Sequence, residues 1–455
     1  MRLKRDPQLN LFAKMRKKNK VVTELEAISA ILDENRALLD LVYQDLLPYR
    51  RSDTGRPGLS AEQVLRCAIL KQYRDLTYEE LAFHVEDSES FRTFSRLQMG
   101  QYPSESTLQE NIKAIGADTW EAINQVLIQY AAAKNLEKGR QIRLDSTVVD
   151  SNIHHPTDST LLQDGIRVIT RLLQAGKSLQ PTLGYWFADH QRAAKKRVMI
   201  ILNARKEKVR TKAYRELLTL ATKVQGYGVE AHACLRAFAS DDLEEIMAAH
   251  RLLAELERAL TLLKRILDQT ERRILRQEKV PAAEKLVSFF ECHTDIIVKG
   301  GRETQYGHKV FLTGGRSGLI LDCLVERGNP SDAAMFPVML DRQEHLFLRP
   351  PRQVASDGGF ASRNNLHQAK SKGIKDVVFA RKRGLSVLEM VKSHRVFKKL
   401  RNFRAGIEAN ISRLKRVFGL TRCSWSGWPG FKQYVWSAIV SYNLLVLGMA
   451  QTEAY

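Results

Sequence analysis

The sequence contains few cysteines, no uninterrupted hydrophobic run and no excess of acidic residues. Its five cysteines include no Cys-x-x-Cys pair, which argues against a disulfide framework or a zinc site and fits a reducing cytoplasm. The most apolar stretch, 431–450, is interrupted by polar residues, so we expect a helix packed on a sheet rather than a membrane span. The first residues lack the apolar segment of a secretory signal. A Gly-x₄-Gly-Lys-Ser/Thr segment is also absent from the sequence, which argues against an NTP-driven helicase or recombinase of that type.

Positive charge is what the sequence has in excess. Lys and Arg number 72 against 51 Asp and Glu, which gives a net charge of +21. Such an excess indicates a polyanionic partner, and nucleic acid fits it better than a membrane surface. The densest cluster, 381–416, contains twelve basic residues and two acids, Glu389 and Glu408. A solvated surface helix is the ordinary explanation of such a stretch, but the embedded Glu408 favours contact with phosphate.

Residues 23 to about 135 have the apolar spacing of helices throughout. Ser60 and Thr77 each begin a capping box, and Ser104 opens a further helix. Short helices joined by capped turns predict a helix-turn-helix-like unit over 77–116. A helical bundle used for dimerisation explains the same pattern equally well, because the segment is charge-mixed rather than basic.

A regular seam of apolar residues runs from Ile246 to Ile274 with alternating spacings of three and four. We therefore expect this helix to pack along another one, around 193–224, which ends at a turn over Gly226-Tyr-Gly228. The segment would then be a helical hairpin or bundle. Clamping of DNA, protein contact and a scaffold role all remain open for it.

From residue 299 the pattern changes from helix to strand. Lys309–Thr313 and Leu319–Val325 flank a glycine-rich turn and predict a β-hairpin. We then expect a helix over 331–346, a strand over 353–356, a helix near 362–372 and a strand over 376–380. Together with a strand over 142–149, this order predicts an α/β (α+β) fold with a mixed sheet covered by helices.

Three carboxylates carry the chemistry. They are Asp145 in Gln141-Ile-Arg-Leu-Asp-Ser-Thr-Val-Val149, Asp357 in Val354-Ala-Ser-Asp-Gly-Gly-Phe360, and Glu408 in Phe403-Arg-Ala-Gly-Ile-Glu-Ala-Asn-Ile-Ser-Arg-Leu-Lys415. An acid inside a buried strand, such as Asp145, must be paired or bind a metal. Carboxylate oxygens are ligands that Mg²⁺ accepts, and two ions about 3.5–4 Å apart stabilise both oxygens of a phosphodiester displacement. The set predicts metal-dependent phosphoryl transfer.

Read in order, Asp-Ser-Thr, Asp-Gly-Gly-Phe and Arg-x₃-Glu-x₆-Lys resemble the DDE transposases of bacterial insertion sequences. The stretches 152–168 and 418–425 are also similar to that family, and the resemblance runs from about residue 25 to the C-terminus. The family often has a Tyr three residues before the Arg, where this chain has Arg401. The resemblance implies an RNase H-like mixed sheet with flanking helices, an N-terminal helical domain and a helical insertion.

The resemblance also implies a reaction, in which a transposase cleaves DNA at element ends and transfers the strand to target DNA. Asp145, Asp357 and Glu408 would hold Mg²⁺, for which Mn²⁺ substitutes. Double-stranded DNA would be bound by Arg404, Lys415, Arg401, Arg413, Arg416, Lys398 and Lys399. Ser146 and Thr147 are expected to orient the metal ligands, and His308, Lys309 and Arg363 are weaker candidates for DNA contact. We expect a homodimer or larger assembly on DNA, in the bacterial cytoplasm with the nucleoid, and no membrane contact.

The expected domains follow the chain in order. They are a basic flexible arm over 1–22, a helical DNA-binding or dimerisation domain over 23–135, the first part of the catalytic domain over 136–163, a coiled-coil-like insertion over 164–290, and the rest of the catalytic domain over 291–455.

Two other functions remain open, namely a transposase-derived DNA-binding protein that no longer cuts, and a nuclease or resolvase on the same fold. The presence of all three acids favours a cutting enzyme. Taken singly, Asp357 is typical of a turn and Glu408 of a salt bridge with Arg404 or Lys415. The rival metal ligands are Asp150 first, then Asp158, Asp164 and Asp322.

Overall fold

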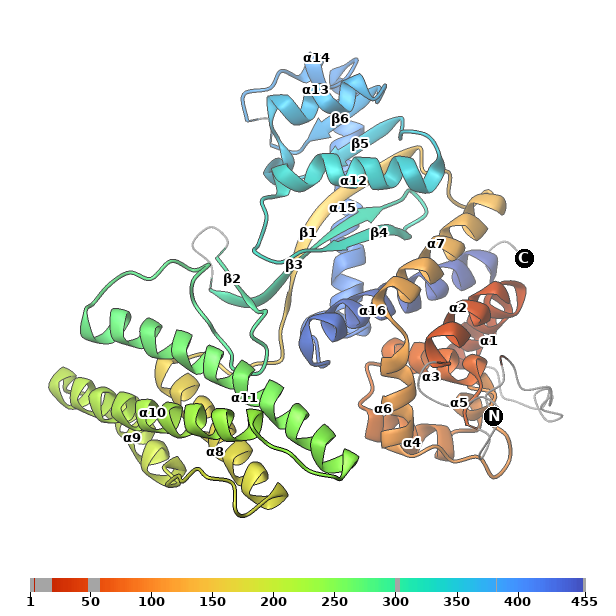
Figure 1. The fold of residues 1–455 in the computed structure, drawn as a ribbon. Coiled ribbons are helices and arrows are strands. Elements are labelled where there is room, and N and C mark those ends of the chain that lie inside the picture. Colours follow the sequence, from red (N-terminus) through yellow and green to blue (C-terminus); the bar gives the residue numbers. More distant parts are fainter. Residues whose placement is uncertain (1–3, 5–18, 48–57, 299–302, 382, 453–455) are drawn as a thin grey trace. The chain divides into compact units, whose positions relative to one another are not determined.

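The computed structural model describes residues 4, 19–47, 58–298, 303–381 and 383–452 (Figure 1). Most of the predicted basic arm lies outside these residues. Contacts within the chain divide it into two units, Met1–Asn152 with Gly307–Tyr455 (unit 1) and Ile153–Tyr306 (unit 2). The domain boundaries predicted from the sequence, and the DNA-binding or dimerisation role of 23–135, stay predictions.

Unit 1 begins with helices, as the sequence predicts. They are α1 (Lys20–Glu34), α2 (Ala37–Leu46), α3 (Ala61–Tyr73), α4 (Tyr78–Asp87), α5 (Glu89–Phe94), α6 (Glu105–Ala114) and α7 (Ala117–Ala133). The predicted capping boxes are confirmed at the starts of α3 and α4, where Ser60 and Thr77 each accept a backbone N–H three residues on. Ser104 caps α6 in the same way, without the reciprocal side-chain bond. Each cap satisfies a donor that a helix start would otherwise leave unpaired.

A mixed sheet follows the N-terminal helices. Its strands in unit 1 are β1 (Gln141–Asp150), β3 (Gln305–Gly314), β4 (Ile320–Val325), β5 (Gln353–Ser356) and β6 (Asp376–Phe379). The order is β3-β1-β5-β6, with β4 on the outer side of β3 and β2 (Asp295–Ile297) also paired to β3. β1 runs antiparallel to β3 and parallel to β5. The predicted hairpin is confirmed by the antiparallel pairing of β3 with β4.

Helices cover both faces of this sheet (Figure 1). They are α12 (Asp332–Phe347), α13 (Arg363–Ser371), the short α14 (Val387–Met390), α15 (His394–Val417) and α16 (Gly427–Thr452), with a 3₁₀ turn at Gly358–Phe360. α15 packs on β1, β5 and β6, whereas α12 packs on β4 and the 3₁₀ turn. The predicted mixed α/β fold is therefore confirmed, and its helices and strands occur where the sequence pattern changes between periods of 3.6 and 2.

The N-terminal helices and the sheet share one hydrophobic core. The predicted helix is confirmed as α16, which contacts β4 of the sheet but packs mainly against the helices α1, α3 and α7. Asn443 on α16 is fully buried, and its side chain accepts from the Ile320 backbone N–H through Oδ1 (2.9 Å) and donates to the Ile320 carbonyl through Nδ2 (2.7 Å). Its amide also donates to Asn124 of α7 at 2.7 Å, so one polar side chain ties α16 to both neighbours.

Unit 2 is a helical bundle with its own core. It contains α8 (Asp158–Leu179), α9 (Gln191–Asn203), α10 (Glu207–Arg236), α11 (Leu243–Thr270) and a π-helical turn at Glu271–Leu275. α8, α10 and α11 pack on one another, which confirms that the apolar seam of α11 lies along other helices.

The turn expected at Gly226–Gly228 was wrong, because α10 continues through it. A Cβ atom at Gly228 would lie 2.7 Å from Leu260 Cδ2 and 3.3 Å from Ile169 Cγ2. Gly228 therefore serves close packing of α10 against α11 and α8. This gain outweighs the roughly 1 kcal/mol that a glycine costs in a helix.

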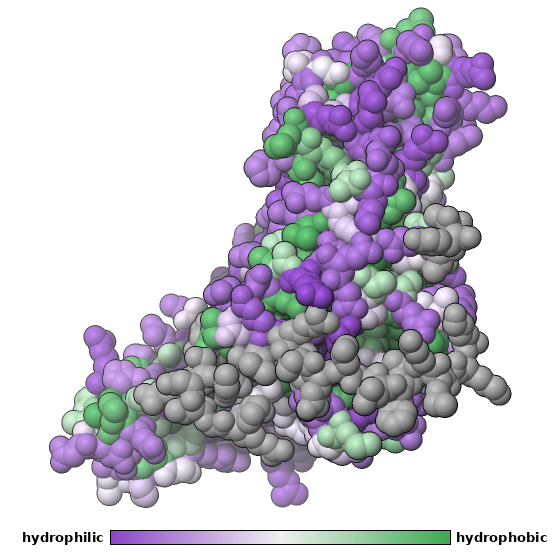
Figure 2. All heavy atoms as spheres, turned by 90° about the vertical axis from the view of Figure 1, so that its right-hand side faces the viewer, coloured by the Kyte–Doolittle hydropathy of each residue, from purple (hydrophilic) through white to green (hydrophobic). Residues whose placement is uncertain are grey.

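The surface drawn in Figure 2 is mainly hydrophilic toward the top of the view, where the helices α12 to α14 lie in Figure 1, and hydrophobic residues are scattered there in small groups. Within the described ranges, none of the helices, α16 included, has the length and apolar character that a membrane span requires.

Candidate active site

The pairing of two parallel strands brings the first two acids together. Leu144 of β1 pairs with Ser356, the last residue of β5. Asp145 and Asp357 are the next residues on these strands, so they lie side by side at the same edge of the sheet. Asp145 is in addition held by pairing with Leu312 on the other side of β1.

α15 approaches β1 closely at Gly406, two residues before Glu408. A Cβ atom at Gly406 would collide with the guanidinium of Arg143, which crosses the helix there. Arg143 donates to the carbonyl of Phe403 at 3.2 Å and lies 4.9 Å from the centre of its ring. Since Arg143 and Asp145 point to the same face of β1, the contact brings Glu408 beside the strand acids.

Arg404 joins the three predicted acids. Its Nη2 atom lies 2.6 Å from Glu408 Oε1, and its Nη1 atom lies 3.6 Å from Asp145 Oδ2 and 3.9 Å from Asp357 Oδ1. The side chains of Arg404 and Asp145 are each 16% exposed, whereas those of Asp357 and Glu408 are 47% and 59% exposed. The salt bridge that is the ordinary explanation of Glu408 is therefore present, within a cluster that contains all three carboxylates.

The cluster changes the acidity of Asp145. The pKa of its carboxyl is raised to about 6, mainly by burial and to a smaller extent by the nearby carboxylates of Asp357 and Glu408, while the Ser146 N–H and Arg404 oppose the shift. The Ser146 N–H donates to Asp145 Oδ1 at 2.7 Å. A carboxyl pKa raised above its usual range is what a partly buried site of like charges produces.

The donor set has the chemistry of a site for hard divalent cations, since it consists of carboxylate oxygens gathered around one positive charge. In the part of the chain that the structure describes, no three His, Cys, Asp or Glu side chains are arranged closely enough to hold a metal ion. The guanidinium of Arg404 lies among the carboxylates instead. The residues thus fit a metal in type and charge, with Arg404 supplying the compensating charge.

The opposite face of β1 carries a second polar cluster. Ser146 Oγ donates to Asp332 Oδ1 at 3.0 Å, and Lys309 Nζ lies 3.4 Å from the same oxygen. Asp332, the first residue of α12, also lies against Gly359 just beyond Asp357. Asp332 was not predicted as a site residue, although Ser331 before it is an N-cap signal that marks the start of this helix.

The rival acids have partners elsewhere. Asp322 forms a two-point ion pair with Arg342 at 2.6 Å, and Asp150 lies near Lys415 and Arg422 at the end of β1. In unit 2, Asp158 pairs with Arg273 at 2.6 Å and Asp164 with Arg167 at 2.9 Å.

The basic residues predicted to bind DNA fall into two groups on α15. Lys398, Lys399, Arg401 and Arg416 are exposed. Arg413 is half-buried beside Tyr442, and Lys415 donates to the carbonyl of Val148 at 2.8 Å.

The weaker candidates for DNA contact differ in their exposure to solvent. Arg363 is exposed at the start of α13. His308 is fully buried between the rings of Trp428 and Phe431, with centroids 4.8 and 4.7 Å away, so the expectation that it contacts DNA was wrong. Thr147 is buried too.

Two family matches bear on this arrangement. Residues 287–444 match the family described as Transposase DDE domain, and residues 11–114 match the one described as Transposase domain (DUF772). The chain belongs to the DDE transposases of insertion sequences. No curated protein and no solved structure matches it.

As a DDE transposase, the protein is an enzyme of transposition with an RNase H-like fold, of a family that binds DNA and generally uses a divalent metal. The matched segment 287–444 includes Asp357 and Glu408 but begins after β1, so Asp145 lies outside it. Unit 2 follows β1 in the chain, and its last residues, 287–306, fall within the matched segment. The pairing of β1 with β3 and β5 joins Asp145 to the other two acids across this insertion.

Proposed function

We propose that this transposase cleaves DNA at the ends of its insertion sequence and joins the freed 3′-hydroxyl to target DNA. Asp145, Asp357 and Glu408 would hold Mg²⁺, or Mn²⁺ in its place. The observation that carries the proposal is the convergence of these three carboxylates on one guanidinium, at the edge of an RNase H-like sheet.

Each residue has a separate part in this reaction. Asp145 is fixed by strand pairing and by the Ser146 N–H, so its second oxygen keeps a constant direction toward the site. Divalent ions bound there supply Lewis acidity for the attacking and leaving oxygens. Arg404, displaced from the carboxylates, has the planar fork that binds a phosphate through two hydrogen bonds. The exposed bases Lys398, Lys399, Arg401 and Arg416 would contact the DNA backbone along α15.

The test incubates the purified chain with DNA that carries the sequences flanking its own coding segment, in Mg²⁺ and in excess chelator. Cleavage followed by strand joining in Mg²⁺ supports the proposal. Cleavage without joining assigns a nuclease or resolvase, and binding without cleavage assigns a transposase-derived DNA-binding protein. Glu408→Gln, which keeps the size of the side chain, is the matched inactive control.

A further inference from the structure

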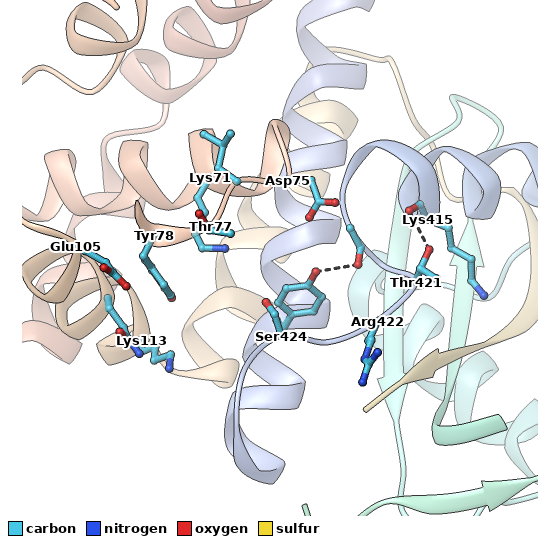
Figure 3. A pocket seen from close by; sticks show the side chains of 14 residues that line it. Lys71, Asp75, Thr77, Tyr78, Glu105, Lys113, Lys415, Thr421, Arg422 and Ser424 are labelled. Atoms are coloured by element: carbon cyan, nitrogen blue, oxygen red, sulfur yellow. Dashed lines mark hydrogen bonds between the residues drawn. The ribbon is translucent and has the colours of Figure 1, made fainter. Parts of the chain in front are cut away.

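A pocket with a volume of about 480 Å³ opens in unit 1, away from the three acids (Figure 3). One wall comes from the N-terminal helices α3, α4 and α6, and the other from the end of α15 and the loop that leads to α16. Lys415 of its lining belongs to the Arg-x₃-Glu-x₆-Lys motif, but none of the three acids lines it, and the motif does not account for the wall of N-terminal helices.

The pocket is basic. Lys71, Lys113, Lys415 and Arg422 line it, against two acids, Asp75 and Glu105. Hydroxyl groups are also available in its lining, on Thr77, Thr421 and Ser424. Ammonium, guanidinium and hydroxyl donors around one cavity are the groups that bind a phosphate.

The two lysines of the N-terminal wall share one aromatic ring. Lys71 Nζ lies 4.7 Å and Lys113 Nζ 5.9 Å from the centre of the Tyr78 ring. Lys71 is 5% exposed, and burial lowers the pKa of its amine to about 8, with Lys113 adding to the effect and Asp75 opposing it. An anion in the pocket would offset the cost of burying this charge, because a buried ammonium is stabilised by a paired negative group.

The lining of the pocket is connected to the helix and the strand that carry Glu408 and Asp145. Lys415 follows Glu408 by seven residues on α15, about 10 Å along a helix. The loop also bonds to the end of the strand that carries Asp145, since Asp150 N–H donates to Thr421 O at 3.0 Å and Cys423 N–H to Asp150 O at 2.7 Å. Asp150 is five residues beyond Asp145, or roughly 17 Å along a strand.

We propose that this pocket binds one backbone phosphate of the DNA, about three to five nucleotides from the bond that the three acids attack, at roughly 3.4 Å of helix axis per nucleotide. The position of that phosphate rests on the proposed function of the acids, whereas the binding of a phosphate does not. The N-terminal helices would thereby help to bind the same DNA that α15 contacts beside the three acids.

The experiment measures affinity for end-bearing DNA in which single phosphates are replaced, one at a time, by uncharged methylphosphonates. The wild type is compared with Lys113→Met and Lys71→Met, without divalent metal so that no cleavage occurs. Lys138→Met is the matched control, because Lys138 is exposed and precedes the opposite end of β1. If Lys71→Met does not fold, Lys113→Met alone carries the test, since Lys113 is only half-buried.

In the wild type, neutralising one phosphate three to five nucleotides from the cut should weaken binding about tenfold, as expected for a charge-assisted contact. In Lys113→Met the same replacement should have no further effect, because the contact is already lost. The slope of log affinity against log salt should fall by about one in this variant and remain unchanged in Lys138→Met.

Fully additive effects of the variant and the neutral phosphate at every position would overturn the inference, even if the protein cuts DNA. Binding of inorganic phosphate that Lys113→Met abolishes, with no coupled DNA position, would also overturn it and indicate a small free anion. A coupled phosphate in a protein that does not cut would support the pocket while the proposed reaction fails.

Discussion

Removal of the Arg404 guanidinium should destabilise the protein without metal and improve its affinity for metal. Arg404→Ala leaves the carboxylates of Asp145, Asp357 and Glu408 close together with no positive charge among them. Like charges repel, so the folded state loses stability in chelator. A divalent cation then enters a site from which the competing charge has been removed.

The size of the effect follows from the distances. A charge pair at 3.6 Å, the separation of Arg404 and Asp145, interacts by about 4–5 kcal/mol at an effective dielectric constant of about 20. The cost of desolvating Arg404 offsets most of this gain. Asp357 and Glu408 are about half exposed, so solvent limits each to at most about 1 kcal/mol. We expect a net loss of about 1–2 kcal/mol, or a fall in Tm of roughly 2–6 °C.

The assay combines thermal unfolding in excess chelator with calorimetric titration of Mn²⁺. Arg404→Ala should bind Mn²⁺ about tenfold more tightly than the wild type, since about 1.4 kcal/mol of repulsion is removed. Arg401→Ala is the control, because Arg401 is an exposed arginine on the same helix, one turn earlier. Arg404→Lys should behave between the two, because it keeps the charge and loses the fork.

An Arg404→Ala variant with wild-type Tm in chelator and wild-type affinity for Mn²⁺ would refute the reasoning. The guanidinium would then not compensate the acids, and the carboxylates would have to be neutralised in another way. An equal change of Tm and of Mn²⁺ affinity in Arg401→Ala would also contradict the reasoning. The cause would then be the general positive charge of α15 and not the position of Arg404.

Four further outcomes are expected. Glu408→Gln should abolish cleavage and joining, while DNA binding survives or tightens. Lys415→Ala should instead weaken end binding and leave residual chemistry at high DNA concentration. Cutting by Glu408→Gln at a near wild-type rate would mean that the third ligand is misassigned, and Glu389 would be the next residue to test. Cleavage should vanish in chelator and return with Mg²⁺ or Mn²⁺, and full activity in excess EDTA would exclude the metal mechanism. Log affinity for duplex DNA should fall with log salt by roughly 0.9 per phosphate contact, and a nearly flat slope would assign the positive charge to some other partner. Gly228→Leu should lower the stability of unit 2 by about 1–3 kcal/mol through overpacking against Leu260, as measured by urea denaturation, whereas an unchanged midpoint would mean that α10 and α11 separate easily.

Much of the local structure followed from the sequence alone. The capping residues Ser60 and Thr77 marked two helix starts, and the strand over 353–356 was predicted with its observed bounds. Such features depend on a few neighbouring residues, because a cap or an alternating pattern acts within one turn of helix or one short strand. The identity of the three acids was also readable, from their order and from the strands and helix that carry them.

The errors arose where distant packing overrides local preference. Two glycines separated by one residue, such as Gly226 and Gly228, normally indicate a turn. Gly228 nevertheless lies inside α10, because Leu260 occupies the space that a side chain would need. His308 looked like a candidate for DNA contact, but Trp428 and Phe431 bury it. Neither neighbour is close in sequence, so no local pattern reveals the contact.

The sequence by itself determined which chemical groups this transposase possesses and which helices and strands carry them. Only the tertiary structure decided that Arg404 lies among all three acids, that Asp332 faces Ser146, and that Lys71 and Lys113 share a pocket with the end of α15. The physical reason is that strand pairing and core packing join residues separated by the whole of unit 2 or by most of the chain. The register of β1 against β5, and the close approach of α15 at Gly406, are properties of the assembled sheet and core.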